Sequence, residues 1–138
     1  MKHIICDEQI LNIRRQADEI VRRTMTPISW TDVNLVSAEA SVSDISELQQ
    51  LVDFIRQQCN RIVVLAWQSE FTHLIIAKSN NVPFLCTHEI AQPITEEYDG
   101  ILVGDQWFSQ VTLYKDNIIP ELIDRAVELI IVALPYEE

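Results

Sequence analysis

The stretch IVVLAWQSEFTHLIIAKSNNVPFLC, which spans residues 62–86, decides the fold that the sequence predicts. It opens with an apolar run rich in β-branched residues, which is typical of a buried strand. A polar loop follows, and the apolar segment 73–79 has the length of a short helix. After a turn at Asn80 and Asn81, the run 82–86 predicts a second strand. We therefore expect a strand–loop–helix–strand unit, in which the loop before the helix commonly carries the chemistry.

The segments before this stretch alternate helix and strand patterns. Asp7 is placed to cap a helix that runs to about Arg23. Asp44, with Glu47 three residues later, approximates a capping box at the start of a second helix. Between these two helices we expect short strands at 28–30 and 33–38.

The pattern changes after Cys86. Residues 87–99 contain a proline and several acids and are expected to form a loop. Gly104 and Asp105 separate two strand patterns, 101–103 and 106–114, and so predict a β-hairpin. A final helix is expected after Asn117. Together these patterns predict an α/β fold, with a compact mixed β-sheet core and flanking helices.

The chain has 138 residues, of which 48% are hydrophobic, and we expect residues 1–138 to form a single domain. Three segments are expected within it: a helix and strands at 1–42, a core at 43–114 and a helix at 115–138. No apolar run is long enough to cross a membrane, and no signal peptide is recognisable. The three widely spaced cysteines, Cys6, Cys59 and Cys86, predict reduced thiols and a cytoplasmic location.

The formal net charge of −11 is unevenly distributed. Residues 1–61 hold nine acids and seven bases, whereas residues 62–138 hold twelve acids and three bases. Phosphate contacts require clustered basic residues, so the charge predicts no direct nucleic-acid binding. The acidity suits a soluble protein, a basic partner or a DNA mimic. We expect a protein partner, and a homo-oligomer stays open as an alternative. Four arginines share the first predicted helix, where they form a basic or solvated face: Arg14, Arg15, Arg22 and Arg23.

Residues 62–114 resemble the phosphohistidine swivelling domain of phosphoenolpyruvate-utilising enzymes. That family has an A-I-V-T strand, a G-G-x-T-S-H loop, an A-A-I-V-A-R helix, a G-I-P-A-V strand and a D-G hairpin. The corresponding segments here are Ile62-Val63-Val64, Leu74-Ile75-Ile76-Ala77-Lys78, Val82-Pro83-Phe84-Leu85 and Asp99-Gly100 onward to Val111. The resemblance implies a swivelling-domain-like β/β/α architecture and a site in the loop before the helix.

The sequence departs from the family in that loop. Trp67 and Gln68 replace both glycines, and the phosphorylated histidine falls on Thr72, so that His73 lies one residue late. Neighbouring helix residues differ by about 100° in direction, and in-line phosphoryl transfer depends on accurate placement. We therefore expect a non-catalytic module that binds a protein partner or small ligand. The expected binding residues are Trp67, Gln68, Ser69, Glu70, Thr72 and His73.

Two alternatives remain open at this point. A stand-alone phosphocarrier would use His73, with Thr72 at the family position, as its catalytic residues. An acidic inhibitor or immunity-type protein would instead use the C-terminal half against a basic target.

Other candidate sites are weaker. Cys86 and His88 supply only two metal-ligand side chains, and the acids Glu96, Glu97 and Asp99 are expected to face water. With two glycines in the chain, phosphate-cradling loops are not expected. We therefore predict no metal and no cofactor.

Overall fold

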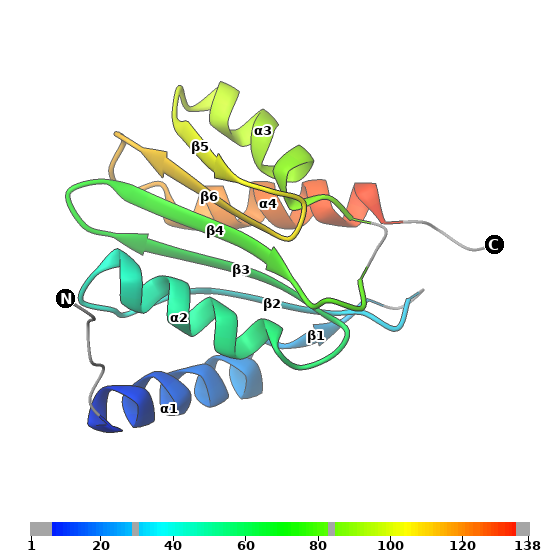
Figure 1. The fold of residues 1–138 in the computed structure, drawn as a ribbon. Helices are drawn as coiled ribbons and strands as arrows, with labels where there is room; N and C mark the ends of the chain where they lie inside the picture. The colour runs from blue at the N-terminus through cyan, green and yellow to red at the C-terminus, as the bar shows by residue number, and fades with distance from the viewer. Residues whose placement is uncertain (1–6, 29–30, 83–84, 135–138) are drawn as a thin grey trace.

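The computed structural model describes residues 7–28, 31–82 and 85–134. The described part contains four helices and six strands (Figure 1). The helices are α1 (Asp7–Thr24), α2 (Ile45–Arg56), α3 (Thr87–Glu97) and α4 (Ile119–Ala133). The strands are β1 (Thr26–Pro27), β2 (Asn34–Glu39), β3 (Arg61–Gln68), β4 (Thr72–Lys78), β5 (Ile101–Gly104) and β6 (Phe108–Leu113).

The six strands form one mixed sheet in the order β1-β2-β3-β4-β6-β5. Only β2 and β3 run parallel, with α2 connecting them, and every other neighbouring pair is antiparallel. A parallel pair requires a crossover connection, which explains why a helix separates these two strands in the sequence.

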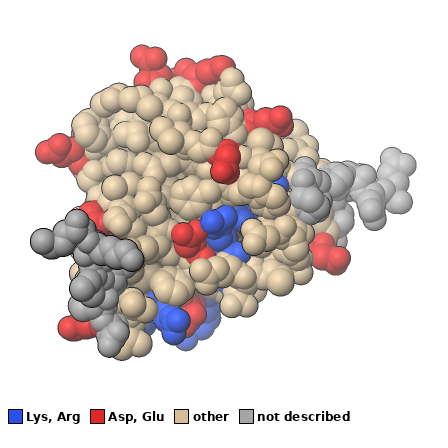
Figure 2. All heavy atoms as spheres, viewed as in Figure 1, with Lys and Arg blue, Asp and Glu red and all other residues tan. Residues whose placement is uncertain are grey.

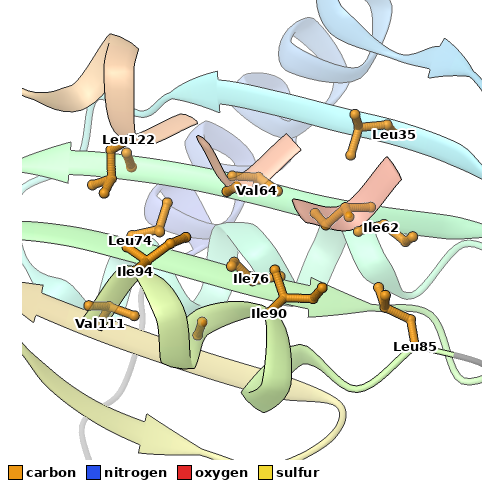
Figure 3. Close-up of a cluster of buried hydrophobic side chains, with 14 of the residues drawn as sticks. Leu35, Ile62, Val64, Leu74, Ile76, Leu85, Ile90, Ile94, Val111 and Leu122 are labelled. Atoms are coloured by element: carbon orange, nitrogen blue, oxygen red, sulfur yellow. The ribbon is translucent and has the colours of Figure 1, made fainter. Parts of the chain in front are cut away.

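Helices cover both faces of the sheet (Figure 1). α1 and α2 pack on one face, against residues such as Val63, Leu65 and Ile75. α3 and α4 pack on the other face, where Figure 3 shows Ile90, Ile94 and Leu122 among the strand side chains. β3 and β4 lie in the middle and are buried on both faces, so their sequences are nearly continuous apolar runs. The α/β prediction, with a compact mixed sheet and flanking helices, is confirmed.

The segment predicted as the helix 73–79 is instead β4. It pairs antiparallel with β3, in a register that places Trp67 opposite His73 and Gln68 opposite Thr72. A short apolar run fits a buried strand as well as a buried helix, and long-range pairing with β3 and β6 decides the outcome here. Val82 and Leu85 are buried but lie in no strand, and the rest of the predicted strand includes residues 83–84, outside the described part.

Several flanking predictions are confirmed. The side chain of Asp44 accepts a hydrogen bond from Glu47 N at 2.8 Å and caps α2. The predicted hairpin forms as β5 and β6, and the final helix forms as α4 with Pro120 in its first turn. The prediction of a loop at 87–99 is wrong, because most of this segment forms the helix α3, with Pro93 inside it.

Candidate functional site

The predicted binding loop is the tip of the β3–β4 hairpin. Ser69, Glu70 and Phe71 connect the paired residues Gln68 and Thr72, and all three connecting residues are exposed. Within the tip, Ser69 N donates a hydrogen bond to Phe71 O at 2.9 Å. The hairpin therefore brings all six predicted binding residues to one end of the sheet. They lie around a turn between two strands, whereas the sequence predicted a loop between a strand and a helix.

Two aromatic rings stack at the base of this tip. The ring centroids of Trp67 and His73 lie 5.2 Å apart, with 19° between the ring planes. His73 Nε2 lies 3.2 Å from Ser69 Oγ, whereas Nδ1 is buried with no hydrogen-bond partner among the described residues. Burial lowers the pKa of His73 below its ordinary value of 6.5, because the charged imidazolium is poorly solvated there. The lowered pKa favours the neutral ring at pH 7, and the ring packs against Trp67 within the hairpin.

Thr72 ties the hairpin to the segment after β6. Its side chain is fully buried, and Oγ1 lies 2.7 Å from Gln68 Oε1 and 2.6 Å from Lys115 O. Gln68 Nε2 also donates to Asp116 Oδ1 at 3.1 Å. These contacts are internal, so Thr72 stabilises the hairpin and is closed to ligands.

Next to the hairpin, part of the sheet has no helix over it. On the side that α1 and α2 cover, one row across the strands reads Trp67, His73, Thr112 and Ile101. The two helices pack over β2, β3 and part of β4. Over β6, Gln49 of α2 donates a hydrogen bond from Nε2 to Gln110 Oε1 at 2.9 Å, and the far end of β6 together with β5 is left open. We call this region the open sheet face, and define it by Phe71, Ile101, Val103, Thr112 and Tyr114.

The open sheet face is apolar and aromatic. Ile101 is 51% exposed, Val103 68% and Tyr114 63%. Phe71, from the hairpin tip, packs edge-to-face on Tyr114 with ring centroids 5.1 Å apart. Figure 2 shows this side of the molecule: the surface over β4, β6 and β5 is mostly uncharged, and acids lie around its rim. The hairpin tip and the open sheet face are thus continuous.

Sequence reasoning missed most of this face. Ile101 and Val103 alternate with the less exposed Leu102, which is the signal of a strand with one outward apolar side. β5 has four residues, which is too short for the alternation to be distinctive. Only the structure shows that no helix covers its outer side.

The remaining candidates do not assemble into a site. Cys86 begins the turn into α3, and His88 and Glu89 lie on that helix. Among the described residues, no group of three or more metal-ligating side chains gathers. Glu97 forms a surface ion pair with Arg125, which holds the pKa of that carboxyl below its ordinary value. No helix in the described ranges has the length and apolar character to span a membrane.

Comparison with known proteins gives a likeness of fold. No protein-family model and no curated protein matches the sequence. The C-Ala domain of Aquifex aeolicus alanyl-tRNA synthetase superposes with a TM-score of 0.65 at 19% identity, covering 80% of this chain and 97% of that chain. RecJ from Thermus thermophilus gives 0.59 at 10% identity, covering 91% of this chain and 18% of that chain. A pGpG-specific phosphodiesterase from Vibrio gives 0.50 at 14% identity, covering 91% and 40%.

These neighbours correct the predicted family. The resemblance to phosphohistidine swivelling domains of phosphoenolpyruvate-utilising enzymes is wrong, since the solved structures of similar fold are the C-Ala domain and RecJ. The physical reason is that 72–78 is a strand, so the family's loop-then-helix element is absent. The phosphocarrier alternative rested on that resemblance and loses this support.

The neighbours also correct the predicted partners. We predicted no direct nucleic-acid binding, and the fold of these neighbours contradicts that exclusion. The same fold occurs in a domain of a tRNA synthetase and in a pGpG-specific phosphodiesterase. The prediction gave more weight to the excess of acids in both halves of the chain than to the four arginines of the first predicted helix.

Proposed function

We propose that this chain is a non-catalytic binding module that holds a protein partner through the β3–β4 hairpin tip and the open sheet face. The observation that carries the proposal is the open sheet face, which is uncharged and partly aromatic in a chain of net charge −11. Contiguous exposed apolar surface is a mark of interaction sites, and aromatic side chains are enriched at the centres of interfaces.

The hairpin suits binding better than catalysis. The His73 ring is stacked on Trp67 and one of its nitrogens is buried, so it presents little surface to a substrate. Thr72 is fully buried behind the tip. Two antiparallel strands in the middle of the sheet hold the tip, which gives a partner a preorganised surface and reduces the entropy lost on binding.

The named neighbours suggest the setting in which such a module works. One is a domain of a tRNA synthetase and another belongs to a pGpG-specific phosphodiesterase, so we propose a nucleic-acid-related context for this chain. A cytoplasmic location belongs to the same proposal, and the free thiols of Cys59 and Cys86 support it.

Affinity capture from the native host tests the proposal with a matched pair of variants. Val103→Glu places a carboxylate on the open sheet face, whereas Val132→Glu makes the same change at an exposed position of α4. Burying an unpaired charge in an interface is costly, so Val103→Glu should reduce capture of the partner by about tenfold or more. Val132→Glu should leave capture unchanged.

Quantitative mass spectrometry reads out both variants against the wild type. Phe71→Ala, at the exposed tip, should weaken capture of the same protein without changing the fold. Equal capture by the wild type, Val103→Glu and Val132→Glu would overturn the proposal. Gel filtration identifies the case in which the partner is a second copy of this chain.

A further inference from the structure

We propose that the groove between α1 and α2 is a binding site for an organic phosphate of nucleotide size. A cavity of about 500 Å³ lies between these two helices and the start of β3. Its lining includes Arg14 and Arg22 from α1, Arg61 from β3, and Asp18, Phe54 and Gln58. We call these six residues the arginine groove. None of them belongs to the hairpin tip or the open sheet face, so the inference is independent of the proposed function.

Among the described residues, the arginines of the groove have no counter-ion within 4 Å. Across residues 7–28, 31–82 and 85–134, ion pairs within 4 Å form at Arg23, Arg56 and Arg125. None forms at Arg14, Arg22 or Arg61. The groove holds three arginines and one aspartate in a chain of net charge −11. Like charges gathered in one groove repel each other, and an anion bound among them relieves that repulsion.

Two of the guanidinium groups are held in place by the protein. The guanidinium carbon of Arg14 lies 5.4 Å from the ring centroid of Phe54, in a cation–π contact. Arg61 Nη1 donates a hydrogen bond to Ile55 O at 3.2 Å, which leaves its other donors available. Guanidinium groups fixed in this way match the oxygens of a phosphate, and charge-assisted hydrogen bonds to phosphate are among the strong ones.

The size of the groove and its other walls point to a nucleotide. A volume of about 500 Å³ lies within the usual range for small-molecule sites. Phe54 supplies an apolar wall, and Gln57 and Gln58 supply amide donors and acceptors suited to a base or sugar. The phosphate belongs either to a free nucleotide or to the end of a nucleic-acid strand, and the chemistry of the site is the same for both.

The opposite flank of α1 provides an internal contrast. A second cavity there is lined by Arg15 and Arg23 together with Glu19 and Glu39. Arg23 lies 3.8 Å from Glu19, so the two charges offset each other. Figure 2 shows blue side chains gathered at the bottom of the molecule, where α1 lies in Figure 1. Only one of the two arginine pairs on α1 therefore lines a groove with excess positive charge.

Calorimetric titration of the full chain at about 50 mM NaCl tests the inference, because surface electrostatics are least screened at low salt. The probes are inorganic phosphate, a purine nucleoside 5′-monophosphate, a short RNA with and without a 5′-phosphate, and a glutamate-rich peptide. The Arg14→Gln/Arg22→Gln double variant should weaken binding by about tenfold or more. The Arg15→Gln/Arg23→Gln double variant, with the same charge change on the same helix, should alter affinity by less than about twofold.

The probes separate the possible outcomes. Tight binding of the nucleotide identifies a free-nucleotide site, and binding of RNA only when it carries a 5′-phosphate identifies a strand-end site. Failure of all the phosphate probes to bind would overturn the inference, as would equal weakening by the two double variants. Binding of inorganic phosphate with no gain from the nucleoside would contradict the nucleotide assignment. A glutamate-rich peptide that binds as tightly as the nucleotide would overturn the phosphate assignment. It would indicate that the groove binds an acidic protein segment instead.

Discussion

His73 shows how one buried side chain links the hairpin to pH. Its folded-state pKa lies below the ordinary value of 6.5, so the unfolded chain binds more protons than the folded chain just below that value. The free energy of unfolding should therefore fall as the pH is lowered through 6.5. Protonation of His73 should no longer lower the free energy of unfolding once the pH lies below the folded-state pKa, because both states then bind the proton.

A comparison of variants isolates this effect. His73→Phe keeps an aromatic ring against Trp67 and removes the proton-binding site, so its stability should change less between pH 7.5 and pH 5.5. His88→Gln, which removes a half-buried histidine on α3, is the control for the loss of a histidine elsewhere in the chain. Urea unfolding at both pH values measures the difference. A wild-type slope retained in His73→Phe would show that other groups cause the pH dependence.

At the scale of elements, the β5–β6 hairpin depends on Gly104. Its φ of 149° lies in a region that side chains with a Cβ rarely adopt, and a Cβ there would collide with the backbone of Phe108. Gly104→Ala should therefore destabilise the chain by about 1–3 kcal/mol. Val103→Ala, one residue earlier and exposed, is the control and should have a smaller effect. Equal unfolding midpoints in urea for Gly104→Ala and the wild type would contradict this account.

The elements that could be predicted from the sequence are those with local signals. Asp44 with Glu47 marks the start of α2, and Gly104 with Asp105 marks a hairpin, because caps and turns depend on neighbouring residues. Local signals fail where distant pairing decides. The run 73–79 fits a short helix or a strand, and only its partners β3 and β6 make it a strand. Pro93 suggested a loop, yet packing of Ile90 and Ile94 against the sheet maintains α3.

The candidate site was foreseen only in part. Trp67 to His73 form one hairpin end, as the sequence suggested, and its exposed residues Ser69, Glu70 and Phe71 are available for binding, whereas Thr72 and His73 are buried behind them. The family assigned to them was wrong because hydrophobic and turn patterns recur in unrelated folds. The open sheet face was not foreseen, since a missing helix over β5 and β6 leaves no mark in the sequence of those strands.

At the scale of the whole molecule, the salt dependence of partner capture distinguishes binding through the open sheet face from binding through the acidic surface of the C-terminal half. Capture through the open sheet face relies on apolar burial and should change little between about 50 mM and about 500 mM NaCl. An acidic inhibitor that uses the C-terminal half would release a basic target over the same range. Affinity capture at both salt concentrations distinguishes them. Loss of the captured protein at high salt would favour the inhibitor hypothesis.

Hydrogen exchange on the complex tests the central claim most directly, because it locates the bound surface. Once a partner has been captured, amide exchange is compared between the free chain and the complex. The account predicts slower exchange in peptides that cover the hairpin tip, 67–73, and the β5–β6 hairpin, 101–114, with α4 unchanged. Protection that is absent from both hairpins, or confined to α4, would contradict it.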